Sequence, residues 1–220
     1  EREPPEAVVI LGTGHRPMTN RVAICDKAFA VPGGAVQNAC DVTQAILDAC
    51  RPAADFAVDA LAHLPEHSIE LQAVWLRHIW GERVRIVPVL VGAMEEFLKA
   101  DADPSAAADD PQLCALAQAL TDLRTQGRAL MLLASADLAH VGPYFQDERD
   151  VDEPYLKEVE EADRQYLAAV ASGEPLAGLQ ALQRVEDRYH VCGAGCIHLL
   201  NAVLAGVPGW TWWYCRTTTW

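Results

Sequence analysis

Histidine, cysteine and acidic residues gather in four short segments of this 220-residue chain. These are Gly12-Thr13-Gly14-His15, Glu66-His67-Ser68-Ile69-Glu70, Ser135-Ala136-Asp137-Leu138-Ala139-His140 and Cys192-Gly193-Ala194-Gly195-Cys196. Imidazole, thiolate and carboxylate groups are the side chains that bind transition metals and move protons in catalysis. We therefore expect a metal centre or an acid–base site to draw on some of them.

The segments that end in His15 and His140 each follow an apolar run. Gly12 and Gly14 allow a sharp turn, which would present His15 as a metal ligand or catalytic base. A loop histidine that only hydrogen-bonds to the backbone is the alternative. Asp137 lies three residues before His140, so its carboxylate can orient the imidazole for acid–base work. The alternative there is a helix cap and a surface histidine.

The other two segments stand at predicted helix starts. The amides and dipole of a helix N-terminus would lower the pKa of the Cys192 thiol, which suits a nucleophile or a soft metal ligand. A buried structural cysteine is the alternative. Ser68 is expected to cap its helix, with Glu66 and Glu70 at the positive helix end, and His67 could face the site. Plain capping is the alternative for this segment.

The elements that position these residues follow from hydrophobic periodicity. Apolar runs predict strands at 7–11, 22–25, 28–31, 84–91 and 129–134. Helical spacing predicts helices at about 38–50, 68–80, 112–126, 154–171, 174–188 and 192–206, and the Trp- and Thr-rich segment 210–220 suits a strand. This order predicts an α/β fold: a central mixed or mostly parallel sheet flanked by helices on both faces. Ligands bind beyond the carboxyl ends of such strands, where His15 and His140 fall.

Composition narrows the function classes. The chain is 51% hydrophobic and 22% charged, which excludes a disordered protein, and its formal net charge of −14 disfavours nucleic-acid and anionic-membrane partners. No apolar run approaches the roughly 18 residues of a membrane span. Seven irregularly spaced cysteines without a secretion signal predict a cytoplasmic protein with free thiols. The motifs of P-loop ATPases, serine hydrolases, HExxH proteases and dinucleotide-binding enzymes are all missing.

Taken together, the segments resemble the Memo family, called AmmeMemoRadiSam system protein B in bacteria and archaea. The resemblance rests on stretches in the family's order: Ile10–His15, Glu66–Glu70, Val87–Gly92, Ser135–His140, Tyr189–Gly193 and Leu199–Ala202. It implies one Memo-like domain over 1–220, similar in fold to class III extradiol dioxygenases. By the same comparison, we expect the chain to lack the family's first strand, with its Ala-Pro-His-Ala-Gly-Tyr metal-binding histidine, and its last strand.

The resemblance also implies roles for individual residues. His15 and Cys192 correspond to metal ligands, and His140, with Asp137 beside it, corresponds to an acid–base histidine. Glu66, His67 and Glu70 would contact the metal ligands and orient them without binding the metal themselves. The implied metal is iron or copper, with zinc as an alternative, because a mixed His/Cys set suits these ions.

Three functions follow as hypotheses. The first is a metal-dependent, dioxygenase-like oxidoreductase acting on an unidentified small molecule. The alternative is an inactive binding or scaffold protein that keeps the fold. The third is a cysteine-nucleophile enzyme that uses Cys192 with His140 or His190.

Overall fold

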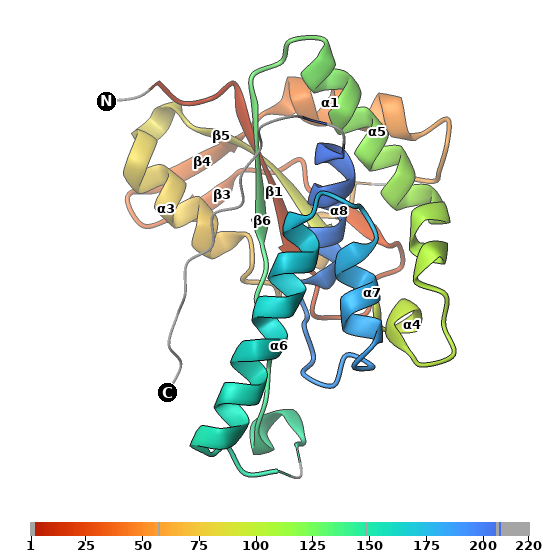
Figure 1. The fold of residues 1–220 in the computed structure, drawn as a ribbon. Coiled ribbons are helices and arrows are strands. Elements are labelled where there is room, and N and C mark those ends of the chain that lie inside the picture. The colour runs from red at the N-terminus through yellow and green to blue at the C-terminus, as the bar shows by residue number, and fades with distance from the viewer. Residues whose placement is uncertain (1–2, 57, 148, 206, 208–220) are drawn as a thin grey trace.

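A six-stranded sheet forms the centre of the molecule (Figure 1). The computed structural model describes residues 3–56, 58–147, 149–205 and 207. The strands are β1 (Ala7–Thr13), β2 (Val22–Ile24), β3 (Phe29–Val31), β4 (Gly34–Asn38), β5 (Arg85–Val91) and β6 (Leu130–Ser135). Their order is β3-β4-β5-β1-β6, and β2 pairs antiparallel with the carboxyl half of β5.

Strand β1 is the core of the sheet. It runs parallel to both β5 and β6, and each of its seven residues is buried. A strand covered on both faces reads as a continuous apolar run, which is why AVVIL stands out in the sequence. Ala7, Val9 and Leu11 face one hydrophobic layer, and Val8 and Ile10 face the other.

Helices cover both faces of the sheet, which confirms the predicted α/β class. The layer that contains Val9 includes residues of α1 (Cys40–Cys50), α5 (Pro111–Thr125) and α8 (Ala194–Leu204), whereas α3 (Glu70–Trp80) packs against the opposite face. The remaining helices are α2 (Ala60–His63), α4 (Glu95–Leu98), α6 (Glu153–Ala171) and α7 (Ala177–Gln183), with 3-10 turns η1 (Gly81–Arg83), η2 (Pro104–Asp109) and η3 (Pro143–Phe145). The start of α6 projects below the body of the molecule (Figure 1).

Two predicted helices need correction, and one strand was not predicted. The helix predicted over 174–188 is shorter, because α7 ends at Gln183 and Glu186 and Asp187 then take left-handed φ angles of 53° and 47°. The last helix begins at Ala194 rather than 192. Strand β4 was not predicted, since the segment Gly34–Asn38 has no apolar run; it forms a hairpin with β3. The strand predicted over 210–220 lies outside the described residues.

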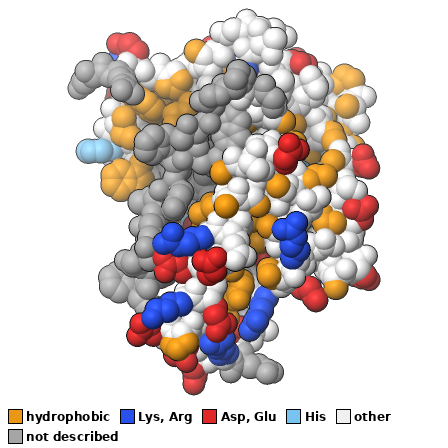
Figure 2. All heavy atoms as spheres, in the orientation of Figure 1, with side chains coloured by type: hydrophobic (Ala, Val, Ile, Leu, Met, Phe, Trp, Pro, Cys, Tyr) orange, Lys and Arg blue, Asp and Glu red, His pale blue; other side chains and the backbone are white. Residues whose placement is uncertain are grey.

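Charged side chains of both signs intermix over α6 and its surroundings (Figure 2). Ion pairs such as Lys157 with Glu153 and Arg149 with Glu158 lie here on exposed side chains. Such pairs contribute little stability, so they describe a solvated helix face. Within the described residues, no helix combines the length and the apolar character that crossing a bilayer requires.

The parallel strands bring the candidate residues to one edge of the sheet. Strands β1, β5 and β6 end at Thr13, Val91 and Ser135, which are in register across the sheet through Gly12 and Thr13. A chain of hydrogen bonds ties this edge to the start of α3: Ser68 Oγ donates to Thr13 O (2.9 Å), and Ser135 Oγ donates to Ser68 O (2.6 Å). Gln72 Nε2 completes the chain by donating to Ser135 Oγ (3.0 Å).

Candidate metal centre

The site begins with a close approach between β1 and the loop before α3. A Cβ atom on Gly12 would lie 2.6 Å from both Ser68 Oγ and Ile69 Cγ1, so only glycine fits there without movement. Ser68 was predicted to cap α3, and that prediction was wrong: its hydroxyl bonds to the Thr13 carbonyl, and no side chain caps the helix. The contact holds the 66–68 segment over the end of β1.

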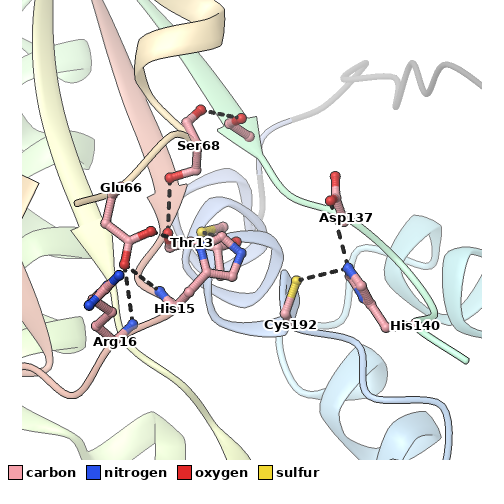
Figure 3. A network of polar contacts seen from close by, with 10 residues as sticks. Thr13, His15, Arg16, Glu66, Ser68, Asp137, His140 and Cys192 are labelled. Carbon is pink, nitrogen blue, oxygen red and sulfur yellow. Dashed lines mark hydrogen bonds and ion pairs between the residues drawn. The ribbon is translucent and has the colours of Figure 1, made fainter. Parts of the chain in front are cut away.

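Glu66 holds His15 in a fixed orientation (Figure 3). The Glu66 side chain is 4% exposed, and its Oε1 accepts the backbone N–H groups of His15 (2.9 Å) and Arg16 (3.2 Å). Its Oε2 lies 2.8 Å from His15 Nδ1. Because an ionised carboxylate only accepts hydrogen bonds, this contact places the imidazole proton on Nδ1 and leaves the lone pair on Nε2 for a metal.

His67 stacks on His15, with ring centroids 5.0 Å apart and ring planes 10° apart. His15, Glu66 and His67 each offer one ligand atom, and these atoms lie within 4.8 Å of one another. Among the described residues, this is the one group of three or more that meets that geometry. Two histidines and a carboxylate are the donor set of many non-haem Fe(II) sites.

Cys192 lies on the other side of a small cavity. His15 and Cys192 both line this cavity, which has a volume of about 160 Å³. The prediction that Cys192 has a lowered pKa was wrong. Burial, reinforced by the charge of Asp137, raises the pKa of this thiol to about 11, and α8 begins two residues later, at Ala194. An unassisted thiolate nucleophile is therefore disfavoured near neutral pH.

His140 directs one ring nitrogen toward both Cys192 and Asp137 (Figure 3). Its Nε2 is 3.9 Å from Cys192 Sγ and 3.8 Å from Asp137 Oδ2. On the other side of the ring, Nδ1 faces the carbonyl oxygens of Leu138 (2.9 Å) and His190 (3.2 Å). Carbonyl oxygens only accept, so the neutral ring carries its proton on Nδ1 and turns a basic Nε2 toward the thiol.

Gly193 allows the two segments that carry Cys192 and His140 to touch. A Cβ atom at this position would lie 2.5 Å from Ala136 Cβ and 2.6 Å from Asp137 O. The backbone N–H of Gly193 also donates to Asp137 O at 3.3 Å. The glycine after Cys192 therefore sets the distance between β6 and the start of α8.

A second, larger cavity opens beside His15. Its volume is about 620 Å³, within the range for small-molecule sites. It is lined by residues 14–21, 92–93, 95–96 and 110–112. His15, together with Gly14, Ala93 and Glu95, lines both cavities, so a ligand in the larger one lies next to the candidate metal centre.

The structure separates the predicted residues into two groups. His15, Glu66 and His67 form one, and Asp137, His140 and Cys192 form the other. Glu70 is the exposed first residue of α3, and within the described part of the chain no hydrogen bond or ion pair joins it to either group. Sequence reasoning missed Asp187, which lines the small cavity and whose pKa burial raises. No motif in the sequence marks it.

The protein is of the α/β class, and histidine, cysteine and carboxylate groups lie at the carboxyl edge of its parallel strands. Comparison with known proteins gives the family. The model for Memo-like proteins matches residues 1–205, and the chain belongs to the Memo family. This confirms the resemblance predicted from the sequence.

Several curated relatives of the chain are named MEMO1 family proteins. It is 32% identical over 179 residues to a MEMO1 family protein of Thermus thermophilus, which covers 81% of this chain and 48% of the relative. It is 29% identical over 195 residues to one of Methanopyrus kandleri (87% and 57%) and 31% identical over 197 residues to one of Thermotoga neapolitana (89% and 60%). The chain thus spans about half the length of the curated relatives it matches.

Proposed function

We propose that this protein binds a transition metal between His15 and Cys192 and acts as a metal-dependent oxidoreductase on a small molecule. One observation carries the proposal: both side chains line one cavity of about 160 Å³, while Glu66 leaves the Nε2 lone pair of His15 free. A carboxylate behind a ligating histidine is a common support in metal sites. We include a cytoplasmic location, supported by the free thiols of the six described cysteines.

The donor chemistry fits iron, copper or zinc. Imidazole and thiolate ligands favour these ions over Mg²⁺ or Ca²⁺. His15 and Cys192 supply two ligands, and His67 stacks close enough to His15 to belong to a rival set of His15, His67 and Glu66. The two sets share His15 and differ in Cys192, which makes them separable by mutation.

The remaining residues act on protons and on the substrate. A bound iron or copper ion would supply one-electron redox chemistry. His140 presents an unprotonated Nε2 toward Cys192 and can accept a proton there. Asp137, 3.8 Å away, stabilises the imidazolium that results. The cavity of about 620 Å³ holds a small molecule against His15.

Metal titration of the purified protein tests the proposal. Cobalt(II) and zinc affinities are measured for the wild type and for Cys192→Ser, His67→Gln and Glu66→Gln. We expect Cys192→Ser to abolish the thiolate-to-cobalt absorption band and Glu66→Gln to weaken binding about 10- to 100-fold. Exposed residues of the same types provide controls: Cys40→Ser and His78→Gln should bind as the wild type does.

Other outcomes identify the alternatives. Binding that survives Cys192→Ser and is lost in His67→Gln would assign the metal to the His15, His67 and Glu66 set. A wild type that binds no metal would favour the binding or scaffold protein. One observation favours this alternative: Glu66 already accepts three N–H groups of His15 and Arg16, so it has a structural role in the loop without any metal.

A further inference from the structure

We propose that Asp187 is a positioning residue that holds His140 and Cys192 in their working geometry. Asp187 lies in the loop between α7 and α8, five residues before Cys192. The consequence for catalysis rests on the proposed function, but the positioning itself can be measured in the metal-free protein.

The loop that carries Asp187 is held in an unfavourable backbone conformation. Glu186, Asp187 and His190 have φ angles of 53°, 47° and 52°, and none of them is glycine. Each such residue is in a strained conformation unless surrounding contacts compensate. Aspartate and asparagine tolerate this region best, because their short side chains bond to nearby backbone.

Asp187 supplies the compensating contacts. Its Oδ1 accepts the backbone N–H of Val191 (2.9 Å), and its carbonyl accepts the N–H of His190 (2.8 Å). Its own N–H donates to Leu182 O (3.0 Å), at the end of α7. Three hydrogen bonds therefore run through one residue and fix the path of the chain from α7 to Cys192.

The loop holds His140 through two hydrogen bonds. Tyr189 O accepts the backbone N–H of His140 (2.7 Å), and His190 O accepts from its Nδ1 (3.2 Å). The same loop then delivers Cys192, whose Sγ lies 3.9 Å from His140 Nε2. Asp187 thus fixes the loop that accepts one of the two hydrogen bonds of His140 Nδ1, the other being to Leu138 O (2.9 Å). It also fixes the position of the Cys192 thiol that faces the ring.

Asp187 is proposed to act through the hydrogen bond that its Oδ1 accepts from Val191 N–H. An asparagine at this position can accept the same bond and should preserve the geometry, whereas an alanine cannot. Nitrogen-15 histidine spectra of the metal-free protein report the tautomer of His140, with His140→Gln used to assign its signals. We expect the wild type and Asp187→Asn to show one tautomer with the proton on Nδ1. In Asp187→Ala that proton should exchange faster with solvent, because the contact of Nδ1 with His190 O is lost and only the contact with Leu138 O remains.

Cobalt(II) titration gives a second readout. We expect Asp187→Ala to weaken cobalt binding about tenfold or more, as removal of a supporting residue does in other metal sites, and Asp187→Asn to stay within about threefold of the wild type. Asp103→Ala is the matched control: it also removes an Oδ1 that accepts a nearby backbone N–H, that of Ser105 (2.9 Å) in η2, far along the chain from Cys192 and His140. It should leave both readouts unchanged.

The results separate this proposal from the proposed function. A wild type that binds no cobalt refutes the metal site, and the tautomer spectra still decide the role of Asp187. An alanine variant with wild-type spectra overturns the positioning role, as does an asparagine variant that behaves like alanine. If Asp187→Ala does not fold, Asp187→Glu takes its place, because the longer side chain moves the acceptor away; wild-type spectra in that variant would overturn the proposal.

Discussion

Gly193→Ala tests whether the start of α8 is packed against the end of β6 as closely as the structure shows. The new Cβ would lie 2.5 Å from Ala136 Cβ, 2.6 Å from Asp137 O and 2.9 Å from Ala136 Cα. None of these atoms is the end of a flexible side chain. The φ angle of Gly193 is −76°, so alanine is conformationally acceptable and the entire effect comes from crowding.

The expected loss of stability is about 2–3 kcal/mol, in the upper part of the range for an overpacked site. At this chain length, that corresponds to a melting temperature lower by about 4–12 °C. Urea denaturation at 25 °C measures the free energy of unfolding. Because the crowded segments carry Cys192 and His140, cobalt(II) affinity should fall in the same variant.

A second substitution identifies the cause. Ala136→Gly removes the atom in the shortest contact, so the double variant should recover about 1 kcal/mol relative to the sum of the two single variants. Strict additivity would refute the contact. A Gly193→Ala variant within about 0.5 kcal/mol of the wild type would refute the close packing of α8 on β6.

Three further predictions concern stability. Burial lowers the pKa of His198, so the unfolded chain binds a proton at this residue before the folded protein does as the pH falls. The free energy of unfolding should therefore decrease below about pH 6.5, by up to about 1.4 kcal/mol per pH unit. His198→Asn should make this decrease smaller in urea titrations at pH 7.5, 6.0 and 5.0. Tyr155→Phe removes a bond from the buried hydroxyl to Asp147 Oδ2 (2.7 Å) and should cost about 1.5–3 kcal/mol in urea denaturation. Tyr144→Phe, at a 90% exposed side chain, should cost nothing measurable. Asp110→Ala removes the cap that accepts two N–H groups of the first turn of α5 and should lower the thermal midpoint, at a cost of about 1–2 kcal/mol.

The sequence predicts strands β1, β5 and β6 because each of them is rich in apolar residues. All seven residues of β1 and six of the seven residues of β5 are buried, whereas β6 is an apolar strand at the edge of the sheet. The parallel arrangement then places His15 and His140 at the carboxyl end of the sheet. Strand β4 has no apolar run, so the sequence does not predict it. No glycine follows the short helix α7 to mark where it ends. The chain there turns on Glu186 and Asp187, two non-glycine residues whose left-handed conformations no sequence pattern indicates.

The site itself is only partly visible in the sequence. Spacing pairs Asp137 with His140, and the structure places them 3.8 Å apart. The contact between His15 and Glu66 spans 51 residues, so no local pattern indicates it. The prediction for the Cys192 thiol failed because helix-end amides were weighed without the larger penalty of burial. Sequence patterns locate charges well, but desolvation depends on the packed fold.

The hydrogen-bonded chain from Thr13 through Ser68 and Ser135 gives the two halves of the site different local stabilities. Opening the half that holds His15 requires breaking bonds anchored in the central strand, so its amides should exchange hydrogen only as slowly as the whole sheet unfolds. The half that holds Cys192 depends on a loop in a costly conformation and should open well before that. The segment around Cys192 should therefore unfold locally before the segment around His15 does. Heat or mild denaturant should expose the Cys192 thiol to solvent first.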